Sequence, residues 1–247
     1  MFKHGKVSNN GTYIHFIDSG SKETNDGVPL IIVPGLSESA EDYILLMESL
    51  QSLRCITITL RGRGHSDAPS EGYTLEDHIS DIESVIKHLH INDVLLMGYS
   101  RGVSYALGYA LTNVTALKGL VLGDYPAIHS QLPEGWVEYF TAQPPWRGKS
   151  IGDRMNRQTL QGIQIESHFV SFWDKLYTIQ CPVLIIRGGK EGAALSEENA
   201  GRYLNELDNA KLVVFEDSNH NIFEPQSDRF VVTVENFLAS IEENKVE

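Results

Sequence analysis

The sequence predicts an α/β protein built on a mostly parallel β-sheet with helices on both faces. Six short runs rich in leucine and β-branched residues recur along the chain, at residues 29–33, 55–60, 93–97, 117–123, 182–188 and 211–216. They have few polar interruptions, as expected of parallel strands that are buried on both faces. Helical patterns lie between them, and strands that alternate with helices form a mostly parallel, doubly covered sheet.

Two further strand-like runs open the chain. They span residues 3–7 and 12–18 and surround Asn9-Asn10-Gly11, which is a hairpin signal. This hairpin would add antiparallel strands at one edge of the sheet. Together with the six runs above, it makes eight strands.

Helical patterns cover the segments 40–50, 75–89, 101–111, 197–207 and 230–242. The clearest is 75–89, where apolar residues recur every three or four positions and form a single stripe. Thr74, followed three residues later by Asp77, is typical of a helix N-cap.

The composition allows one large α/β domain or two small ones. The 247 residues are 41% hydrophobic and 21% charged, which is ordinary for a globular protein. The net charge of −13 disfavours binding to nucleic acid or to an anionic membrane surface. There is no apolar signal-peptide region and no run near the roughly 20 apolar residues of a membrane span. We therefore expect a cytoplasmic protein without nucleic-acid or membrane partners.

The two cysteines, Cys55 and Cys181, lie beside strand-like runs. Free cysteine is among the most buried residue types, so we expect inert thiols. Neither belongs to a CxxC pair, so the sequence predicts no metal site and no redox site. It implies no cofactor.

One stretch, residues 125–179, interrupts the alternation of strands and helices. It holds all three tryptophans, Trp136, Trp146 and Trp173, and nine of the 22 aromatic residues. We expect a helical insert with a small core of its own, some of whose aromatic residues line an apolar substrate pocket. His168, in the same stretch, is a further candidate for contact with substrate.

Ser100 is the candidate nucleophile. It lies in Gly98-Tyr99-Ser100-Arg101-Gly102, directly after a buried strand and directly before a helix. This is the context of a nucleophile elbow, where a sharp turn strains the serine backbone and glycines let strand and helix approach. The N–H of Arg101, at the start of the helix, would point to a developing oxyanion.

A serine hydroxyl needs a base to take its proton, and His220 is the candidate. It follows the last strand-like run, in a loop at the carboxyl end of a parallel strand, where such sheets place reactive groups. A carboxylate must then orient the imidazole. Two acids lie at carboxyl ends of strands: Glu191, after residues 182–188, is our first choice, and Asp124, after residues 117–123, is the alternative.

The second oxyanion donor is expected in Pro34-Gly35-Leu36, which follows the first long parallel strand. Gly35 lets the backbone turn inward, and the N–H of Leu36 would be the donor.

These motifs resemble those of the α/β-hydrolase superfamily. Residues 98–102 look like its nucleophile elbow, and residues 34–36 like its HGx oxyanion loop, with Pro34 in place of the usual histidine. The stretch from Leu60 to Asp67 is similar to the D-x-R-G-x-G-x-S stretch of its lid-bearing hydrolases. The resemblance covers essentially the whole chain. It implies a core domain of residues 1–124 and 180–247, with a short helical cap of residues 125–179 after the sixth strand.

The resemblance also bears on the acid and on the chemistry. Most members have Asp where this chain has Glu191, and some take the acid from the position of Asp124. Members that displace at carbon use an Asp nucleophile, so a serine implies attack on a carbonyl. The leading hypothesis is a serine hydrolase of esterase, thioesterase or lactonase type acting on a small, apolar substrate. The alternatives are a Ser-His lyase or cofactor-free oxidative enzyme, and a ligand-binding or signalling protein with a vestigial triad.

Overall fold

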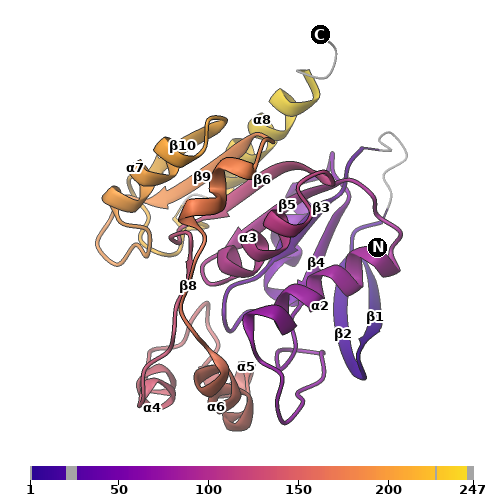
Figure 1. Ribbon diagram of the computed structural model, residues 1–247, viewed down its shortest axis with the longest axis vertical. Coiled ribbons are helices and arrows are strands. Elements are labelled where there is room, and N and C mark those ends of the chain that lie inside the picture. Colours follow the sequence, from indigo (N-terminus) through magenta and orange to yellow (C-terminus); the bar gives the residue numbers. More distant parts are fainter. Residues whose placement is uncertain (1, 21–26, 226, 244–247) are drawn as a thin grey trace.

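An eight-stranded sheet runs through the middle of the molecule, in a computed structural model that describes residues 2–20, 27–225 and 227–243 (Figure 1). The strand order is β1-β2-β4-β3-β5-β6-β9-β10. The strands are β1 (Lys3–Asn9), β2 (Thr12–Asp18), β3 (Leu30–Val33), β4 (Cys55–Thr59), β5 (Val94–Tyr99), β6 (Leu117–Gly123), β9 (Val183–Gly188) and β10 (Ala210–Phe215). The pairs β1–β2 and β2–β4 are antiparallel and the others are parallel. The predicted sheet, with a hairpin at one edge, is confirmed.

Helices cover both faces of this sheet. They are α1 (Ile44–Ser49), α2 (Leu75–His88), α3 (Gly102–Thr112), α7 (Glu197–Glu206) and α8 (Ser227–Glu243), and a 3₁₀ turn, η1 (Ala40–Tyr43), leads into α1. The prediction of one continuous helix over 40–50 is therefore wrong in its first turn. The other four predicted helices are confirmed, with ends that differ by at most three residues.

The core consists of two apolar layers separated by the sheet. Along β3, Ile31 and Val33 pack into the layer under α2, α3 and α7, whereas Leu30 and Ile32 pack into the layer under α1 and α8. All four residues are fully buried, which explains why the strand reads as a continuous apolar run.

The insert, residues 125–179, leaves the sheet after β6 and returns before β9. It contains β7 (Ile128–His129), α4 (Trp136–Thr141), α5 (Ile151–Arg154), α6 (Arg157–Glu166), β8 (Val170–Ser171) and the 3₁₀ helix η2 (Trp173–Thr178). Figure 1 shows α4, α5 and α6 together at one end of the molecule. Their side chains form a small apolar cluster with Tyr73, which precedes α2. The expected insert thus contains helices, together with a two-stranded ribbon, β7–β8, at its base. The assignment of core and cap domains to these segments stays a prediction.

None of the helices in the described ranges combines the length and the apolar character that crossing a bilayer requires. Cys55 is buried and Cys181 is partly buried. Burial raises the pKa of the Cys181 thiol to about 12. This thiol therefore stays protonated near neutral pH, as expected of an inert cysteine.

Candidate active site

The turn that carries Ser100 is strained, as the elbow motif predicts. Ser100 has a φ of 53°, a left-handed conformation that residues other than glycine rarely adopt. A Cβ atom at Gly98 would lie 2.8 Å from the Gly102 carbonyl oxygen, and one at Gly102 would lie 2.3 Å from the Pro34 carbonyl oxygen. Only glycine therefore fits at the positions two residues before and two residues after the serine. The strained turn places Ser100 at the carboxyl end of β5.

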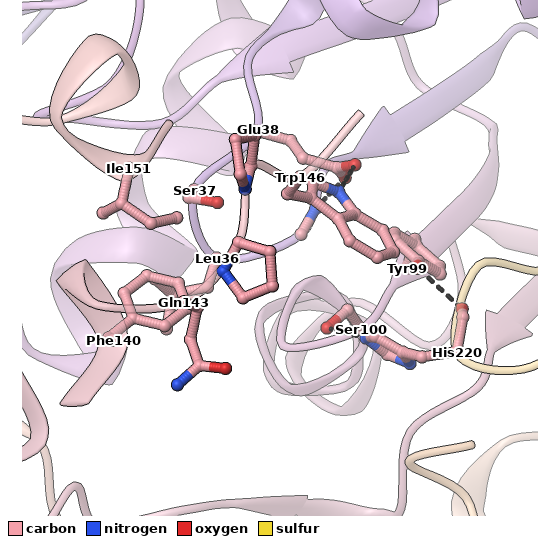
Figure 2. Close-up of a pocket in the computed structure, with 13 residues that line it drawn as sticks. Leu36, Ser37, Glu38, Tyr99, Ser100, Phe140, Gln143, Trp146, Ile151 and His220 are labelled. Carbon is pink, nitrogen blue, oxygen red and sulfur yellow. Dashed lines mark hydrogen bonds between the residues drawn. The ribbon is translucent and has the colours of Figure 1, made fainter. Parts of the chain in front are cut away.

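His220 lies between Ser100 and Asp124. Its Nε2 is 2.8 Å from Ser100 Oγ, and its Nδ1 is 2.8 Å from Asp124 Oδ2. The ring stacks on Tyr99 with centroids 5.2 Å apart, and the Tyr99 hydroxyl donates a hydrogen bond to the His220 carbonyl at 2.7 Å (Figure 2). The three side chains therefore form one hydrogen-bonded row, in the order that nucleophilic catalysis by serine requires.

Asp124 is fully buried and has its backbone in the left-handed region, at a φ of 45°. Its carboxylate accepts hydrogen bonds from the backbone N–H groups of Gly188, at 3.1 Å, and Ala194, at 2.8 Å. Oδ2, which receives the Ala194 bond, is also the atom that faces His220. The loop after β9 thus holds the carboxylate against the imidazole.

The structure corrects our choice of Glu191 as the acid. Glu191 is exposed in the turn after β9, and within the described residues it makes no hydrogen bond or ion pair with His220. The loop after β9 instead turns the backbone N–H groups of Gly188 and Ala194 toward Asp124. Asp124, at the end of β6, is therefore the carboxylate that lies against His220 Nδ1.

Leu36 lies on the loop after β3 and lines the cavity with Ser100, and Arg101 directly follows Ser100 at the N-cap of α3. Among the described residues, neither amide N–H has a hydrogen-bond partner. The carbonyl of Leu36 accepts from Arg63 Nε at 2.9 Å, and the N–H of Gly35 donates to Glu38 Oε2 at 3.0 Å. Arg63 and Glu38 thus hold the loop on both sides of the Leu36 amide.

The side chain of Arg101 points away from the serine. Its guanidinium donates to Ser130, and Nη2 lies 3.0 Å from His129 Nε2. Burial and, to a lesser extent, the nearby Arg101 cation lower the pKa of His129 to about 3. A neutral His129 therefore accepts a hydrogen bond from the Arg101 guanidinium, and this bond joins β7 to the start of α3. The side chain of Arg101 is occupied there, so only its backbone is available near Ser100.

A cavity of about 350 Å³ opens above Ser100 and His220 (Figure 2). It is lined by the loop after β3, by the elbow and by the insert, through Gly35, Leu36, Ser37, Glu38, Tyr99, Ser100, Phe140, Gln143, Pro144, Pro145, Trp146, Ile151 and His220. Most of these side chains are apolar, and none is a lysine or an arginine.

Of the aromatic residues proposed for the pocket, only Trp146 lines it. Trp136 stacks on Phe140 at 4.7 Å and stands behind the wall. Trp173 is buried against Tyr203 of α7, and His168 lies at the surface near Glu76. The prediction is wrong for Trp136, Trp173 and His168, because their side chains pack between the insert and the core or face solvent. The wall residues Phe140, Gln143 and Ile151 lacked a sequence signal of their own.

Glu38 is the residue that sequence reasoning missed most clearly. Its side chain is almost fully buried, and Oε2 accepts from the Gly35 N–H and from the Tyr43 hydroxyl at 2.6 Å. Oε1 accepts from Trp146 Nε1 at 2.8 Å and from Arg147 at 3.2 Å. One carboxylate therefore joins the loop of Leu36 to the wall of the cavity. A single glutamate in a loop has no motif that would reveal this role.

Comparisons with known proteins agree with this architecture. A model of the alpha/beta hydrolase family matches residues 30–233. A Bacillus subtilis protein aligns at 31% identity over 154 residues, which are 62% of this chain and 52% of that relative. An N-formylmaleamate deformylase from Pseudomonas putida aligns at 32% identity over 124 residues, 49% of this chain and 45% of that relative. The chain thus spans about half the length of these curated relatives.

The solved structure of an esterase from Exiguobacterium antarcticum superposes with a TM-score of 0.77 at 24% identity, covering 96% of this chain and 98% of the esterase. Likeness at this identity shows a common fold. The family model covers more than three quarters of the sequence, from β3 into α8. The chain belongs to the alpha/beta hydrolase family.

Proposed function

We propose that this protein is a serine hydrolase that cleaves a small, uncharged, largely apolar ester-like substrate through an acyl-enzyme on Ser100. The observation that carries the proposal is the row Ser100–His220–Asp124, with both contacts at 2.8 Å, at the floor of an apolar cavity. A serine that shares a hydrogen bond with an imidazole oriented by a buried carboxylate is activated for attack on a carbonyl carbon.

In the proposed reaction, Ser100 Oγ attacks the carbonyl carbon while His220 Nε2 takes the hydroxyl proton. Asp124 stabilises the imidazolium that forms. The amides of Leu36 and Arg101 donate hydrogen bonds to the oxyanion, which is stronger stabilisation in a cavity than in water. His220 then returns the proton to the leaving alcohol, and the acyl group stays on Ser100. A water molecule, deprotonated by His220, attacks the acyl carbonyl and releases the acid and the free serine.

The lining of the cavity favours a neutral substrate. Its polar groups besides Ser100 and His220 are Ser37, Gln143 and the carboxylate of Glu38. A substrate carboxylate would lose water without meeting a cation, and burying an unpaired charge is costly. A volume of about 350 Å³ lies at the small end of ligand pockets. We therefore expect short, neutral acyl groups to be preferred.

The test is a matched pair of substrates, p-nitrophenyl butyrate and mono-p-nitrophenyl succinate, which share a leaving group and have acyl chains of the same four-carbon length. We expect kcat/KM for the neutral ester to exceed that for the charged one at least tenfold, about 1.4 kcal/mol in the transition state. A burst of p-nitrophenol equal to the enzyme concentration should precede steady turnover. Preference for the succinate ester would contradict the assignment of a neutral substrate. Negligible turnover of both esters and of a broader acyl series would contradict the hydrolase itself.

Glu38→Gln tests the link between the oxyanion loop and the cavity wall. Glutamine has one acceptor oxygen and one NH₂ group in place of the two carboxylate oxygens. Its NH₂ group would face two hydrogen-bond donors, either Gly35 and Tyr43 or Trp146 and Arg147, and the bonds on that side would be lost. We expect kcat to fall about tenfold, since one misplaced oxyanion donor costs at least that much. Glu48→Gln, at an exposed position on α1, is the matched control and should keep full activity. Unchanged kcat in Glu38→Gln, measured with p-nitrophenyl butyrate, would show that this network does not position the loop.

A further inference from the structure

Three histidines and a glutamate lie together outside the cavity above Ser100. His4 is on β1, His15 is on β2, Glu41 is on η1, and His65 is in the loop after β4. The β1–β2 hairpin thus brings two imidazoles close to a carboxylate and an imidazole from two later segments. No spacing motif connects these residues, so the sequence predicted no metal site.

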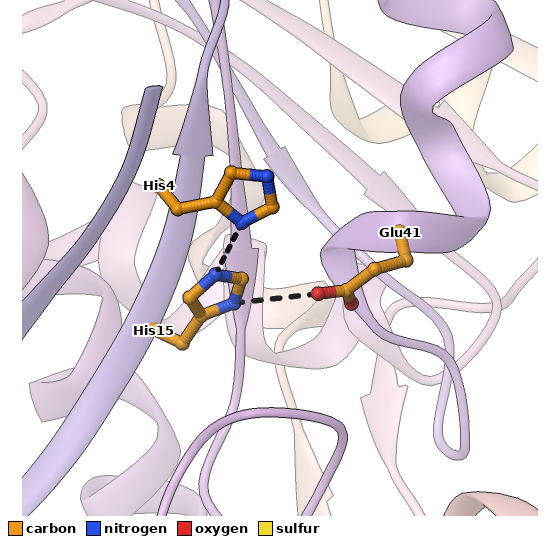
Figure 3. Close-up of side chains that lie close together, drawn as sticks. All are labelled: His4, His15 and Glu41. Carbon is orange, nitrogen blue, oxygen red and sulfur yellow. Dashed lines mark hydrogen bonds and ion pairs between the residues drawn. The ribbon is translucent and has the colours of Figure 1, made fainter. Parts of the chain in front are cut away.

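These side chains are close to one another. His4 Nδ1 lies 3.1 Å from His15 Nε2, and Glu41 Oε1 lies 3.8 Å from the other nitrogen of the His15 ring, Nδ1 (Figure 3). One ligand atom from each of these three residues lies within 4.8 Å of the others. His65 Nε2 completes the group at 3.6 Å from Glu41 Oε1. Zinc–nitrogen bonds of 2.0–2.1 Å in a tetrahedral site place two nitrogens about 3.3 Å apart, which the His4–His15 pair already matches.

The carboxylate of Glu41 lacks what a buried charge requires. Both of its oxygens are inaccessible to solvent, and neither has a hydrogen-bond partner. An unsatisfied buried carboxylate is destabilising, and such groups in native proteins call for an explanation. Three imidazoles lie around this carboxylate, which has no hydrogen-bond partner among the described residues. Imidazoles and a carboxylate gathered in this way form a donor set for a cation.

We propose that His4, His15, Glu41 and His65 bind one Zn²⁺ ion. Imidazole and carboxylate ligands suit Zn²⁺, whereas Mg²⁺ and Ca²⁺ prefer oxygen alone. Thr59 Oγ1, 3.1 Å from His15 Nδ1, accepts its proton and leaves Nε2 facing His4. His4 then carries its own proton on Nε2, so that its Nδ1 can also bind the metal. The exposed His65 and the partly buried Glu41 would rotate to close the remaining distances.

Lys6 is expected to weaken the binding of a metal ion at this site. It is the cross-strand partner of His15 and lines the same surface hollow as His4, His15 and His65. Its positive charge opposes that of the metal, so replacing it should tighten binding. The bound ion would join the β1–β2 hairpin to η1, which follows the loop of Leu36 and Glu38. Binding is therefore expected to stabilise the fold.

The experiment is a calorimetric titration of the untagged, metal-free protein with ZnCl₂ at pH 7.5, together with thermal unfolding. We expect one ion per chain and a rise in Tm of about 5 °C when zinc exceeds its Kd a hundredfold. His4→Ala and Glu41→Gln should each weaken binding at least tenfold, and Lys6→Gln should strengthen it. His88→Ala, which removes an exposed histidine on α2, should bind zinc as the parent does. MgCl₂ should leave Tm unchanged.

Three outcomes would overturn the proposal. The first is the absence of both heat and a Tm shift in the parent protein. The second is equal affinity in the parent, His4→Ala and Glu41→Gln. The third is binding that survives these changes and disappears in His220→Ala, which would place the ion on the residues around Ser100 instead.

Discussion

Ser100→Ala is expected to lower kcat for p-nitrophenyl butyrate at least about 1,000-fold, because the reaction loses the atom that attacks the carbonyl. Alanine keeps the Cβ atom, so the strained backbone at a φ of 53° meets the same steric demands as before. The fold should therefore remain intact, with circular dichroism and Tm close to those of the parent. Some catalysis over water would remain from binding and from the oxyanion donors.

The matched control is Ser84→Ala, which removes a hydroxyl from α2 that bonds only to the Asp81 carbonyl. It should keep full activity. A fluorophosphonate probe, read by intact mass, should add one label to the parent and to Ser84→Ala and none to Ser100→Ala. Full turnover in Ser100→Ala would contradict the proposal that Ser100 is the nucleophile. A parent that labels but shows no burst with the ester series would favour chemistry without an acyl-enzyme.

Asp124→Asn should lower kcat about 1,000-fold or more, whereas Glu191→Gln should leave it unchanged. The asparagine amide can no longer both accept from His220 Nδ1 and keep the bonds from Gly188 and Ala194. The imidazole then loses its orientation and the charge that stabilises its protonated form. Asparagine tolerates the left-handed backbone at this position, so a loss of folding is not the expected cause.

The two variants are measured with the same ester and with circular dichroism as a check on folding. Glu191→Gln is an equally conservative change of an acid at the carboxyl end of a neighbouring strand, and it is exposed. It thus controls for a general effect of removing negative charge near the site. A large loss in Glu191→Gln with a fully active Asp124→Asn would reverse the assignment of the acid.

The elements that sequence reasoning predicted well depend on local patterns. Continuous apolar runs mark strands that are buried on both faces, and Ile31 and Val33 alternate with Leu30 and Ile32 between the two layers of the core. The glycines of the elbow are readable because the motif lies within five consecutive residues, although the atom that excludes a Cβ at Gly102 is the distant Pro34 carbonyl oxygen. The 3₁₀ geometry of η1 was missed because its apolar spacing resembles that of an α-helix.

The errors share one physical origin, which is that they concern residues brought together from distant parts of the chain. Glu191 and Asp124 both follow parallel strands, and a linear pattern does not say which carboxylate the loop after β9 leaves facing His220. Trp173 and Trp146 are both tryptophans of the same insert, and the sequence does not distinguish their roles. Trp173 packs against Tyr203, whereas Trp146 contacts Glu38 and His220. Glu38 gave no signal at all, because its four donors come from three separate segments.

The sequence by itself determined the fold class and predicted the elbow, Ser100 and His220, since local sterics and hydrophobic periodicity can be read along the chain. Only the tertiary structure decided that Asp124 stands behind His220, that Glu38 joins the oxyanion loop to the cavity wall, and that four dispersed side chains meet around Glu41. These contacts depend on strand order and on how the insert packs, which are settled by the balance of burial and hydrogen bonding over the whole molecule.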